Sequence, residues 1–215
     1  MELKIKIVFI SAAIVGLILL PVHHLGNSVG DDLFLLMGIS PWTDRGKYGL
    51  HLPVILGFTL LFIGCIGVSK LYRSRYPKIG SRLLIGIIAY FLVFPYITEQ
   101  MSFLTKFNST GISSVAYSKK DSSCNFTAEG KQVKAVCKLN IYNYGKLEQV
   151  TIRPIVNDWS NPTEFEPKVA TLHPRSQTFL NEVFYGEQVE DTSRQSWGSG
   201  IGLEIQVNGY RKKFE

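Results

Sequence analysis

Three histidines and two aspartates in the first quarter of the chain have side chains that suit metal binding. His23 and His24 are adjacent, Asp31 and Asp32 follow them, and His51 comes later. Imidazole and carboxylate groups are common ligands of zinc and other transition metals. Adjacent side chains at a helix end point about 100° apart, however, so one ion would bind both histidines only if the helix broke locally. We therefore expect no metal and no cofactor, and interpret these residues as polar groups near a membrane surface. A metal site is the alternative.

Known catalytic motifs are missing from the sequence, which contains no GxSxG, Walker, HExxH or CxxC pattern. A nucleophile and a base cannot be placed together from the residues alone, so we expect a protein that is not an enzyme. Glu99 is the one acidic candidate, because it lies within a long apolar run and acidic groups in membrane segments are often functional. It stands only five residues before the end of that run at Leu104. Its carboxylate is therefore expected to reach water or lipid headgroups.

Cys124 and Cys137 have the spacing of a disulfide across a β-hairpin. If Gly130 and Lys131 form a type II′ turn, in which glycine supplies the positive φ, the two cysteines face each other. They then form a non-hydrogen-bonded pair, where neighbouring strands come closest. We predict this disulfide, with two free buried cysteines as the alternative. The register collects apolar side chains on one face and leaves Val136 as the one apolar residue on the other. That apolar face comprises Cys124, Phe126, Ala128, Val133, Ala135, Cys137, Leu139 and Ile141.

Three apolar runs, residues 5–22, 50–68 and 83–104, have the composition of membrane helices. About 20 apolar residues cross a hydrocarbon core of about 30 Å. We therefore predict a membrane region over residues 1–104 with three helices. The first run is expected to be an anchor and not a cleaved signal peptide, because it is long and lacks a small-x-small cleavage pattern.

A basic segment, residues 69–82, separates the second and third runs and sets the expected orientation. Basic residues in short loops are retained in the cytoplasm. We therefore predict a multi-pass protein of the cell membrane, with the N-terminus in the cytoplasm and both the loop 23–49 and the C-terminal part outside. The lipid bilayer is then its first partner. The segment contains no acidic residue and five basic ones, Lys70, Arg73, Arg75, Lys78 and Arg82.

The formal net charge of +6 comes mainly from this one segment. In residues 106–215, 14 basic and 12 acidic residues are scattered along the chain. They form no basic stripe of the kind that follows nucleic-acid phosphates. We therefore expect no nucleic-acid partner.

From residue 105 onward, apolar and polar residues alternate in short runs. This pattern predicts an antiparallel β-sandwich over residues 105–215. Besides the hairpin, strands are expected at 149–156, 168–172, 178–185, 201–207 and 210–214, with a type I′ turn at Asn208-Gly209. Pro154 should lie at a sheet edge or end its strand, and residues 186–200 are interpreted as a long mobile loop.

This strand rhythm resembles the immunoglobulin-like or fibronectin-like modules of cell-surface proteins. The resemblance covers residues 112–215 and includes the turn-like segment 172–176. It departs from the immunoglobulin pattern, because the two cysteines lie within one hairpin instead of flanking a core tryptophan.

Two classes of function follow from the sequence. In the first, which we favour, the β-domain binds a protein, a cell-wall polymer or a membrane subunit without chemistry, with Trp159 or Trp197 as a contact residue. In the second, the helices act as a transport, sensor or signalling subunit through Glu99, the histidines or the basic loop. The sequence predicts no specific ligand for either class.

Overall fold

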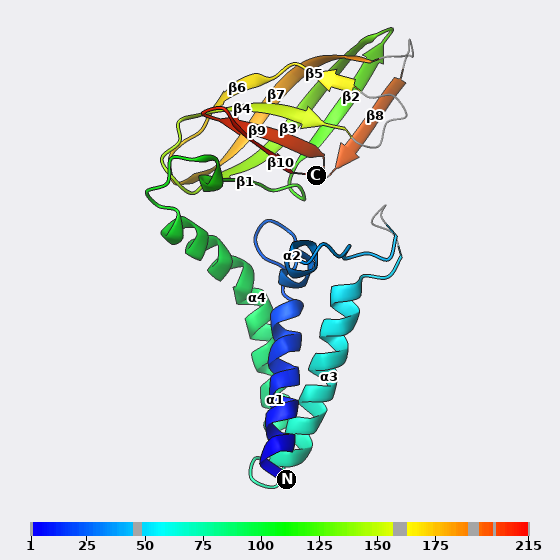
Figure 1. Cartoon of the computed structure of the whole chain (residues 1–215), viewed down its shortest axis with the longest axis vertical. Helices are drawn as coiled ribbons and strands as arrows, with labels where there is room; N and C mark the ends of the chain where they lie inside the picture. The colour runs from blue at the N-terminus through cyan, green and yellow to red at the C-terminus, as the bar shows by residue number, and fades with distance from the viewer. Residues whose placement is uncertain (1, 45–48, 157–162, 189–193, 200, 215) are drawn as a thin grey trace. The chain divides into compact units, whose positions relative to one another are not determined.

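The structure is a computed structural model that describes residues 2–44, 49–156, 163–188, 194–199 and 201–214 (Figure 1). The chain divides into two compact units, Met1–Glu99 and Gln100–Glu215. The first is helical, and the second consists mainly of antiparallel β-strands. We describe each unit by itself.

The described residues form helices α1 (Glu2–Leu19), α2 (Val29–Leu36), α3 (Leu52–Tyr72) and α4 (Ile79–Thr105). α2 begins with a capping box: Ser28 Oγ accepts from the Asp31 N–H at 3.0 Å, and Asp31 Oδ2 accepts from the Ser28 N–H at 2.9 Å. α3 has Pro53 in its first turn, where the missing N–H leaves no bond unmade.

Among the described residues, two helices are long and apolar enough to span a membrane, not the three predicted from the sequence. They are α3, with 21 residues, and α4, with 27. The remaining predicted span, the first run at residues 5–22, falls largely on α1, which is a helix of 18 residues. α1 includes Glu2, Lys4 and Lys6, so its uncharged part is shorter than the roughly 20 residues a membrane span needs.

α1 and α3 pack side by side in antiparallel directions through glycines of α3 (Figure 1). A Cβ atom at Gly64 would lie 2.7 Å from the Cα of Ala13, and one at Gly57 would lie 2.8 Å from Cγ of Leu20. Both distances are below van der Waals contact. The absence of a side chain at these positions therefore permits close packing of the two helices.

The second unit contains two curled antiparallel sheets (Figure 1). The larger has the order β5-β7-β3-β2-β8, with β1 also paired to β3, and the smaller has the order β10-β9-β4-β6. Antiparallel β-structure is confirmed, but an immunoglobulin-like sandwich is not, because the sheets are open. The strands are β1 (Val115–Tyr117), β2 (Ser123–Glu129), β3 (Gln132–Asn143), β4 (Gln149–Ile155), β5 (Thr163–Phe165), β6 (Lys168–Thr171), β7 (Ser176–Gln188), β8 (Arg194–Ser199), β9 (Gly202–Val207) and β10 (Tyr210–Phe214).

The β2–β3 hairpin has the predicted register. Cys124 faces Cys137, and Glu129 faces Gln132 at the turn. Gly130 has a φ of +65°, as a type II′ turn requires at its first central position. A disulfide joins the two cysteines, whose Cα atoms are 4.1 Å apart.

Side chains of both sheets share one core. Every residue on the predicted apolar face of the hairpin is at most 3% exposed. Phe184 from β7 and Ile152, Leu203 and Ile205 from the smaller sheet join the same cluster. The sheets therefore each have one face directed to the core and one face directed away from it.

The prediction of a long loop at 186–200 is wrong for the part that the structure describes. β7 extends to Gln188, and Arg194–Ser199 forms β8 along the free edge of β2. Because β8 is an edge strand, it needs no regular apolar alternation, and residues 194–199 show no alternation that would predict a strand. Residues 189–193 and 200 lie outside the description.

Two further predictions, a turn and the position of a proline, agree with the backbone. Asn208 and Gly209 both have positive φ, 49° and 84°, as a type I′ turn requires. Pro154 pairs with Leu203 of β9, at a point where the pairing of β4 with β6 has already ended at Ile152. Its missing N–H therefore removes no bond to β6, which is the local edge position expected for proline.

Candidate functional site

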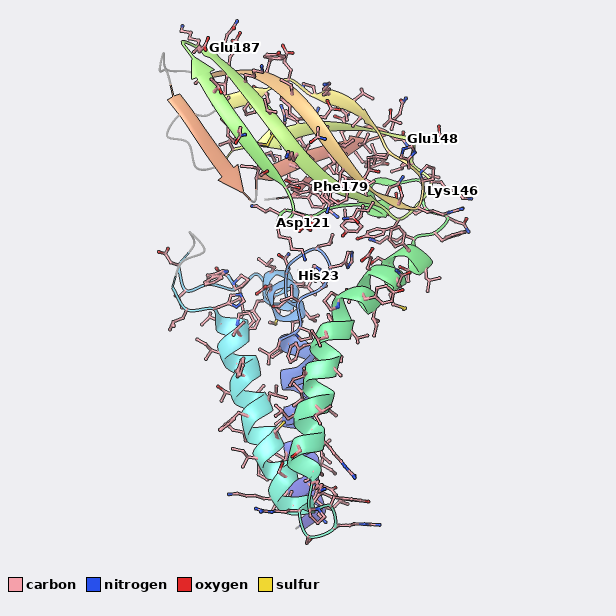
Figure 2. All side chains as sticks on the ribbon, turned by 180° about the vertical axis from the view of Figure 1, so that it is seen from behind. His23, Asp121, Lys146, Glu148, Phe179 and Glu187 are labelled. Atoms are coloured by element: carbon pink, nitrogen blue, oxygen red, sulfur yellow. A yellow bond between two sulfur atoms is a disulfide. The ribbon has the colours of Figure 1, made fainter. Side chains whose placement is uncertain are left out.

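The outer face of the larger sheet, opposite the core, carries exposed apolar side chains on β3 and β7. Phe179 on β7 is labelled in Figure 2. Phe179 and Tyr185 on β7 are 67% and 59% exposed, and Val136 on β3 is 45% exposed. Side chains of a strand alternate between faces, and the residues on either side of Val136 belong to the core. Val136 therefore points outward. We call Val136, Phe179, Val183 and Tyr185 the outer patch.

Strand pairing places Val136, Val183 and Tyr185 close together, and Phe179 lies farther along the same face of β7, beyond the pair Lys138–Asn181. Val136 faces Val183, and Tyr185 faces Lys134 on the neighbouring strand. Directly opposed side chains in antiparallel strands have Cβ atoms about 4.5–5.5 Å apart. Lys134 and Lys138 are exposed on either side of Val136, so positive charge lies among the apolar side chains of the patch.

Hydrogen bonds fix the backbone beside Phe179. Asn140, which faces Phe179, is 1% exposed although it points to the outer face. Its Oδ1 accepts from Gln177 Nε2 at 3.0 Å, and its N–H donates to Ser122 Oγ at 2.9 Å. These bonds hold the polar end of the sheet in one arrangement. Phe179 is consequently presented from a rigid element, as a binding surface requires.

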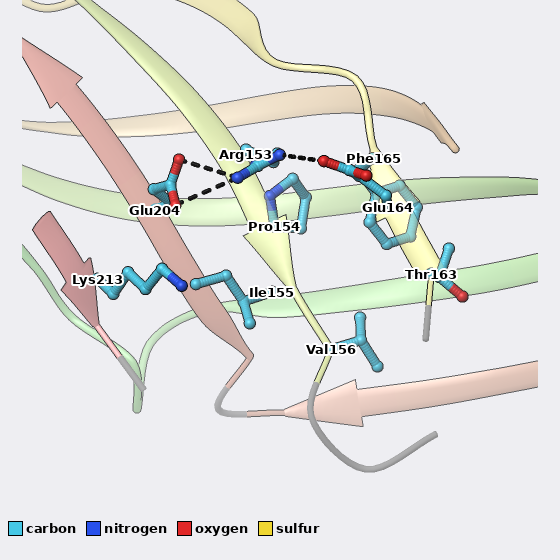
Figure 3. A pocket seen from close by; sticks show the side chains of 9 residues that line it. All are labelled: Arg153, Pro154, Ile155, Val156, Thr163, Glu164, Phe165, Glu204 and Lys213. Carbon is cyan, nitrogen blue, oxygen red and sulfur yellow. Dashed lines mark hydrogen bonds and ion pairs between the residues drawn. The ribbon is translucent and has the colours of Figure 1, made fainter. Parts of the chain in front are cut away.

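A pocket of about 190 Å³ lies beside β4 in the smaller sheet (Figure 3). One guanidinium nitrogen of Arg153 donates to Glu164 Oε1 at 2.8 Å, and another donates to both carboxylate oxygens of Glu204 at 3.1 and 3.2 Å. The Glu204 side chain is only 7% exposed, so this pairing compensates a nearly buried charge. Arg153 is already paired with two carboxylates, so it is poorly placed to bind an anionic ligand. The remaining lining residues are Pro154, Ile155, Val156, Thr163, Phe165 and Lys213.

Two of the N-terminal histidines form separate pairs with the two aspartates. Nε2 of His23 lies 3.2 Å from Oδ2 of Asp32, and Nε2 of His51 lies 2.7 Å from Oδ1 of Asp31. The contact between His51 and Asp31 is within ion-pair distance, but Oδ1 of Asp31 accepts no hydrogen bond from the described residues. Each imidazole thus has its own carboxylate, and the four groups do not surround one point.

His24 is directed to another partner. Its Nδ1 lies 3.2 Å from Oγ1 of Thr98 on α4, and the Thr98 hydroxyl donates to the Pro95 carbonyl at 2.8 Å. Across the part of the chain that the structure describes, no group of three or more His, Cys, Asp or Glu side chains is arranged to hold a metal ion. The geometry supports a role for the histidines in joining the loop after α1 to α2, α3 and α4.

No protein-family model, curated protein or solved structure matches this chain. Function therefore has to be inferred from the chemistry of its own side chains, since a fold class alone does not specify one.

Within the described ranges, neither the basic segment nor Glu99 forms a site with other residues. Lys70, Arg73, Arg75, Lys78 and Arg82 are all exposed. The segment 69–82 is mostly not a loop, because α3 continues to Tyr72 and α4 begins at Ile79. Glu99 is half-buried on α4 and forms no ion pair with any described residue.

Sequence reasoning missed the outer patch. It named Trp159 and Trp197 as contact residues, but Trp159 and the Trp197 side chain lie outside the described residues. Val136 carried a signal, as the apolar exception on a polar face. β7 carried a second signal, because both of its faces are apolar in the sequence. Leu180 and Phe184 form one face, and Phe179, Val183 and Tyr185 form the other. A strand with one face in solvent does not need a second apolar face.

Proposed function

We propose that this protein is a membrane-anchored binding protein whose β-unit holds a protein partner on the outer patch, without catalysis. The exposure of Phe179, Tyr185 and Val136 on a rigid sheet face carries the proposal. Burying a phenylalanine side chain contributes about 1.5–3 kcal/mol. Phe179 is 67% exposed, so its burial by a partner is worth about two thirds of that. Two such aromatic residues and a valine are sufficient for the central anchors of an interface.

The charges of the patch indicate the chemistry of the partner. Lys134 and Lys138 flank Val136, so a matching surface places carboxylates beside its apolar side chains. Such exposed charges mainly raise the association rate and select the partner, while the apolar side chains supply the affinity. We expect binding to weaken moderately as the ionic strength rises.

The membrane part of the proposal rests on α3, α4 and the basic residues between them. α3 and α4 cross the cell membrane, and the turn with Arg73, Arg75 and Lys78 stays in the cytoplasm. The β-unit that follows α4 then lies on the other side. The Cys124–Cys137 disulfide supports this placement, because disulfides persist in oxidising compartments outside the cytoplasm.

Site-specific photocrosslinking in native membranes tests the binding surface. A benzophenone amino acid is placed in the full chain at position 179 or 136, or at control positions 169 or 210. Val169 and Tyr210 are 61% and 70% exposed, but they belong to β6 and β10 of the smaller sheet. We expect the same crosslinked species from positions 179 and 136 and none from the controls.

Substitutions sharpen the test. Tyr185→Ser should abolish the crosslink from position 179, and Val169→Ser should leave it unchanged. Equal crosslinking from all four positions, or insensitivity to Tyr185→Ser, would contradict the proposal. Because Tyr185 is exposed, its replacement is not expected to unfold the sheet.

A second candidate function is a subunit that works within the membrane through its helices. α4 favours it, because none of its 27 residues is buried within this chain. Lipid or another membrane protein then covers α4. If Glu99→Gln, and not Tyr185→Ser, removes a partner crosslinked from α4, the helices carry the function and the β-unit is an accessory.

A further inference from the structure

Three cationic side chains gather in the second unit at the point where α4 ends. Lys106 is the first residue after α4. Lys212 lies on β10 and acts electrostatically on Lys106. The Arg175 guanidinium lies 3.6 Å from the ring centroid of Phe107, and its Nε donates to the Phe107 carbonyl at 3.3 Å.

Aromatic rings, not carboxylates, hold these cations. Lys106 Nζ is 5.0 Å from the centre of the Tyr144 ring, and Lys212 Nζ is 4.7 Å from the centre of the Phe214 ring. Neither lysine forms an ion pair with any described residue. A ring attracts a cation through its quadrupole but does not cancel the charge. The positive charge at this place is therefore left uncompensated.

Burial lowers the pKa of Lys106, and the Lys212 ammonium lowers it further; burial also lowers the pKa of Lys212. Lys106 is half-buried, so its charged form is held at a cost in the free protein. An anion placed between the two ammonium groups would remove that cost.

The length of α4 indicates the surroundings of this cluster. Its 27 residues correspond to about 40 Å at 1.5 Å per residue. A bilayer is about 40–45 Å thick when its headgroup layers are included. If α4 is inserted over this length, Lys106 is expected at the level of the lipid headgroups. Exposed Phe107 beside it is apolar and can enter the boundary between headgroups and acyl chains.

We propose that Lys106 and Lys212 bind a phosphate group, supplied by an anionic phospholipid of the leaflet in which α4 ends. Arg175 adds a third positive charge beside Phe107. The inference rests on the proposed membrane insertion of α4 and goes beyond the proposed protein-binding function. It assigns this end of the β-unit a second, lipid-directed contact.

Amine labelling of the full chain in lipid nanodiscs tests the proposal without a mutation. The labelling rates of Lys106 and Lys212 are measured by mass spectrometry in phosphatidylcholine discs and in discs that also contain phosphatidylglycerol. Lys131 is the matched control, since it is exposed at the β2–β3 turn, at the other end of β3 from Tyr144. We expect anionic lipid to slow both site lysines about three-fold or more, as a rise of about half a pKa unit requires, and to leave Lys131 unchanged.

Adding inorganic phosphate to phosphatidylcholine discs distinguishes the source of the phosphate. Slowing by phosphatidylglycerol alone supports the lipid site. Equal slowing by inorganic phosphate supports a phosphate site that is filled from solution. No slowing in either case, or equal slowing of Lys131, would overturn the proposal. A chain that does not enter the discs would instead contradict the proposed membrane insertion.

A variant checks that the two lysines act together. Lys106→Gln should abolish the lipid-dependent slowing of Lys212, because one ammonium alone holds the phosphate weakly. Lys131→Gln should leave it unchanged. Persistence of the slowing in Lys106→Gln would contradict a shared site.

Discussion

Breaking the Cys124–Cys137 disulfide should destabilise the β-unit by about 3 kcal/mol. The crosslink has a sequence separation of 13. The chain-entropy relation assigns a closed loop of about that size roughly 3 kcal/mol at 25 °C. For a domain of this size, such a loss lowers the melting temperature by about 10 °C or more. Reduction leaves both sulfur atoms in place, so it tests the crosslink without creating a cavity.

The assay is urea unfolding of the full chain in detergent micelles, followed by tryptophan fluorescence with and without reductant. Cys124→Ala/Cys137→Ala should remove the response to reductant. Cys65→Ala should keep it, because Cys65 is the free cysteine of α3. If oxidised and reduced chains unfold within about 0.5 kcal/mol of each other, the chain-entropy argument for this hairpin fails.

Three further changes have expected outcomes. Burial raises the pKa of Tyr117 to about 12 from its ordinary value of 10.0. Because the pKa is higher in the folded state, the protonated phenol contributes about 2–3 kcal/mol to the free energy of unfolding, which should be intact below pH 10 and lost as the pH rises to 12. Urea unfolding against pH should show this loss in the native chain and not in Tyr117→Phe. Glu204→Ala should cost about 1–3 kcal/mol in the same assay, because it leaves the half-buried Arg153 guanidinium with Glu164 as its remaining carboxylate partner. Glu164→Ala, at an 85% exposed side chain, should cost less than about 1 kcal/mol. Gly64→Leu should separate α1 from α3 and lower the thermal stability of the helical unit in nanodiscs. Gly86→Leu on α4 should leave that stability unchanged, because no neighbouring atom of the described residues lies within 4 Å of the added Cβ.

The β2–β3 hairpin was predictable because its signals are local and agree with one another. Alternation, the glycine of the turn and the spacing of Cys124 and Cys137 all specify one register. The turn at Asn208-Gly209 was predictable for the same reason. In each case two consecutive residues determine the turn and the flanking alternation determines the faces.

Features that depend on distant residues were not predictable in this way. The outer patch requires β7 to lie beside β3 with Val183 opposite Val136, and no local pattern indicates that pairing. The same holds for Arg153, which meets Glu204 across 51 residues of sequence. α1 was misjudged because the predicted run began at residue 5 and left out Glu2 and Lys4, although the helix contains both.

The position of β3 has a consequence for the order in which the β-unit assembles. β3 pairs with β2, its immediate neighbour in the chain, but its other edge pairs along its whole length with β7, which begins at Ser176. During synthesis the hairpin can close, and its cysteines can oxidise, well before β7 exists. Until then β3 has a free edge and an uncovered apolar face. Such a species is prone to pair with other chains, and closing so distant a strand contact makes folding slow. Efficient production of this protein therefore depends on protecting one nascent strand until residue 188 has been made.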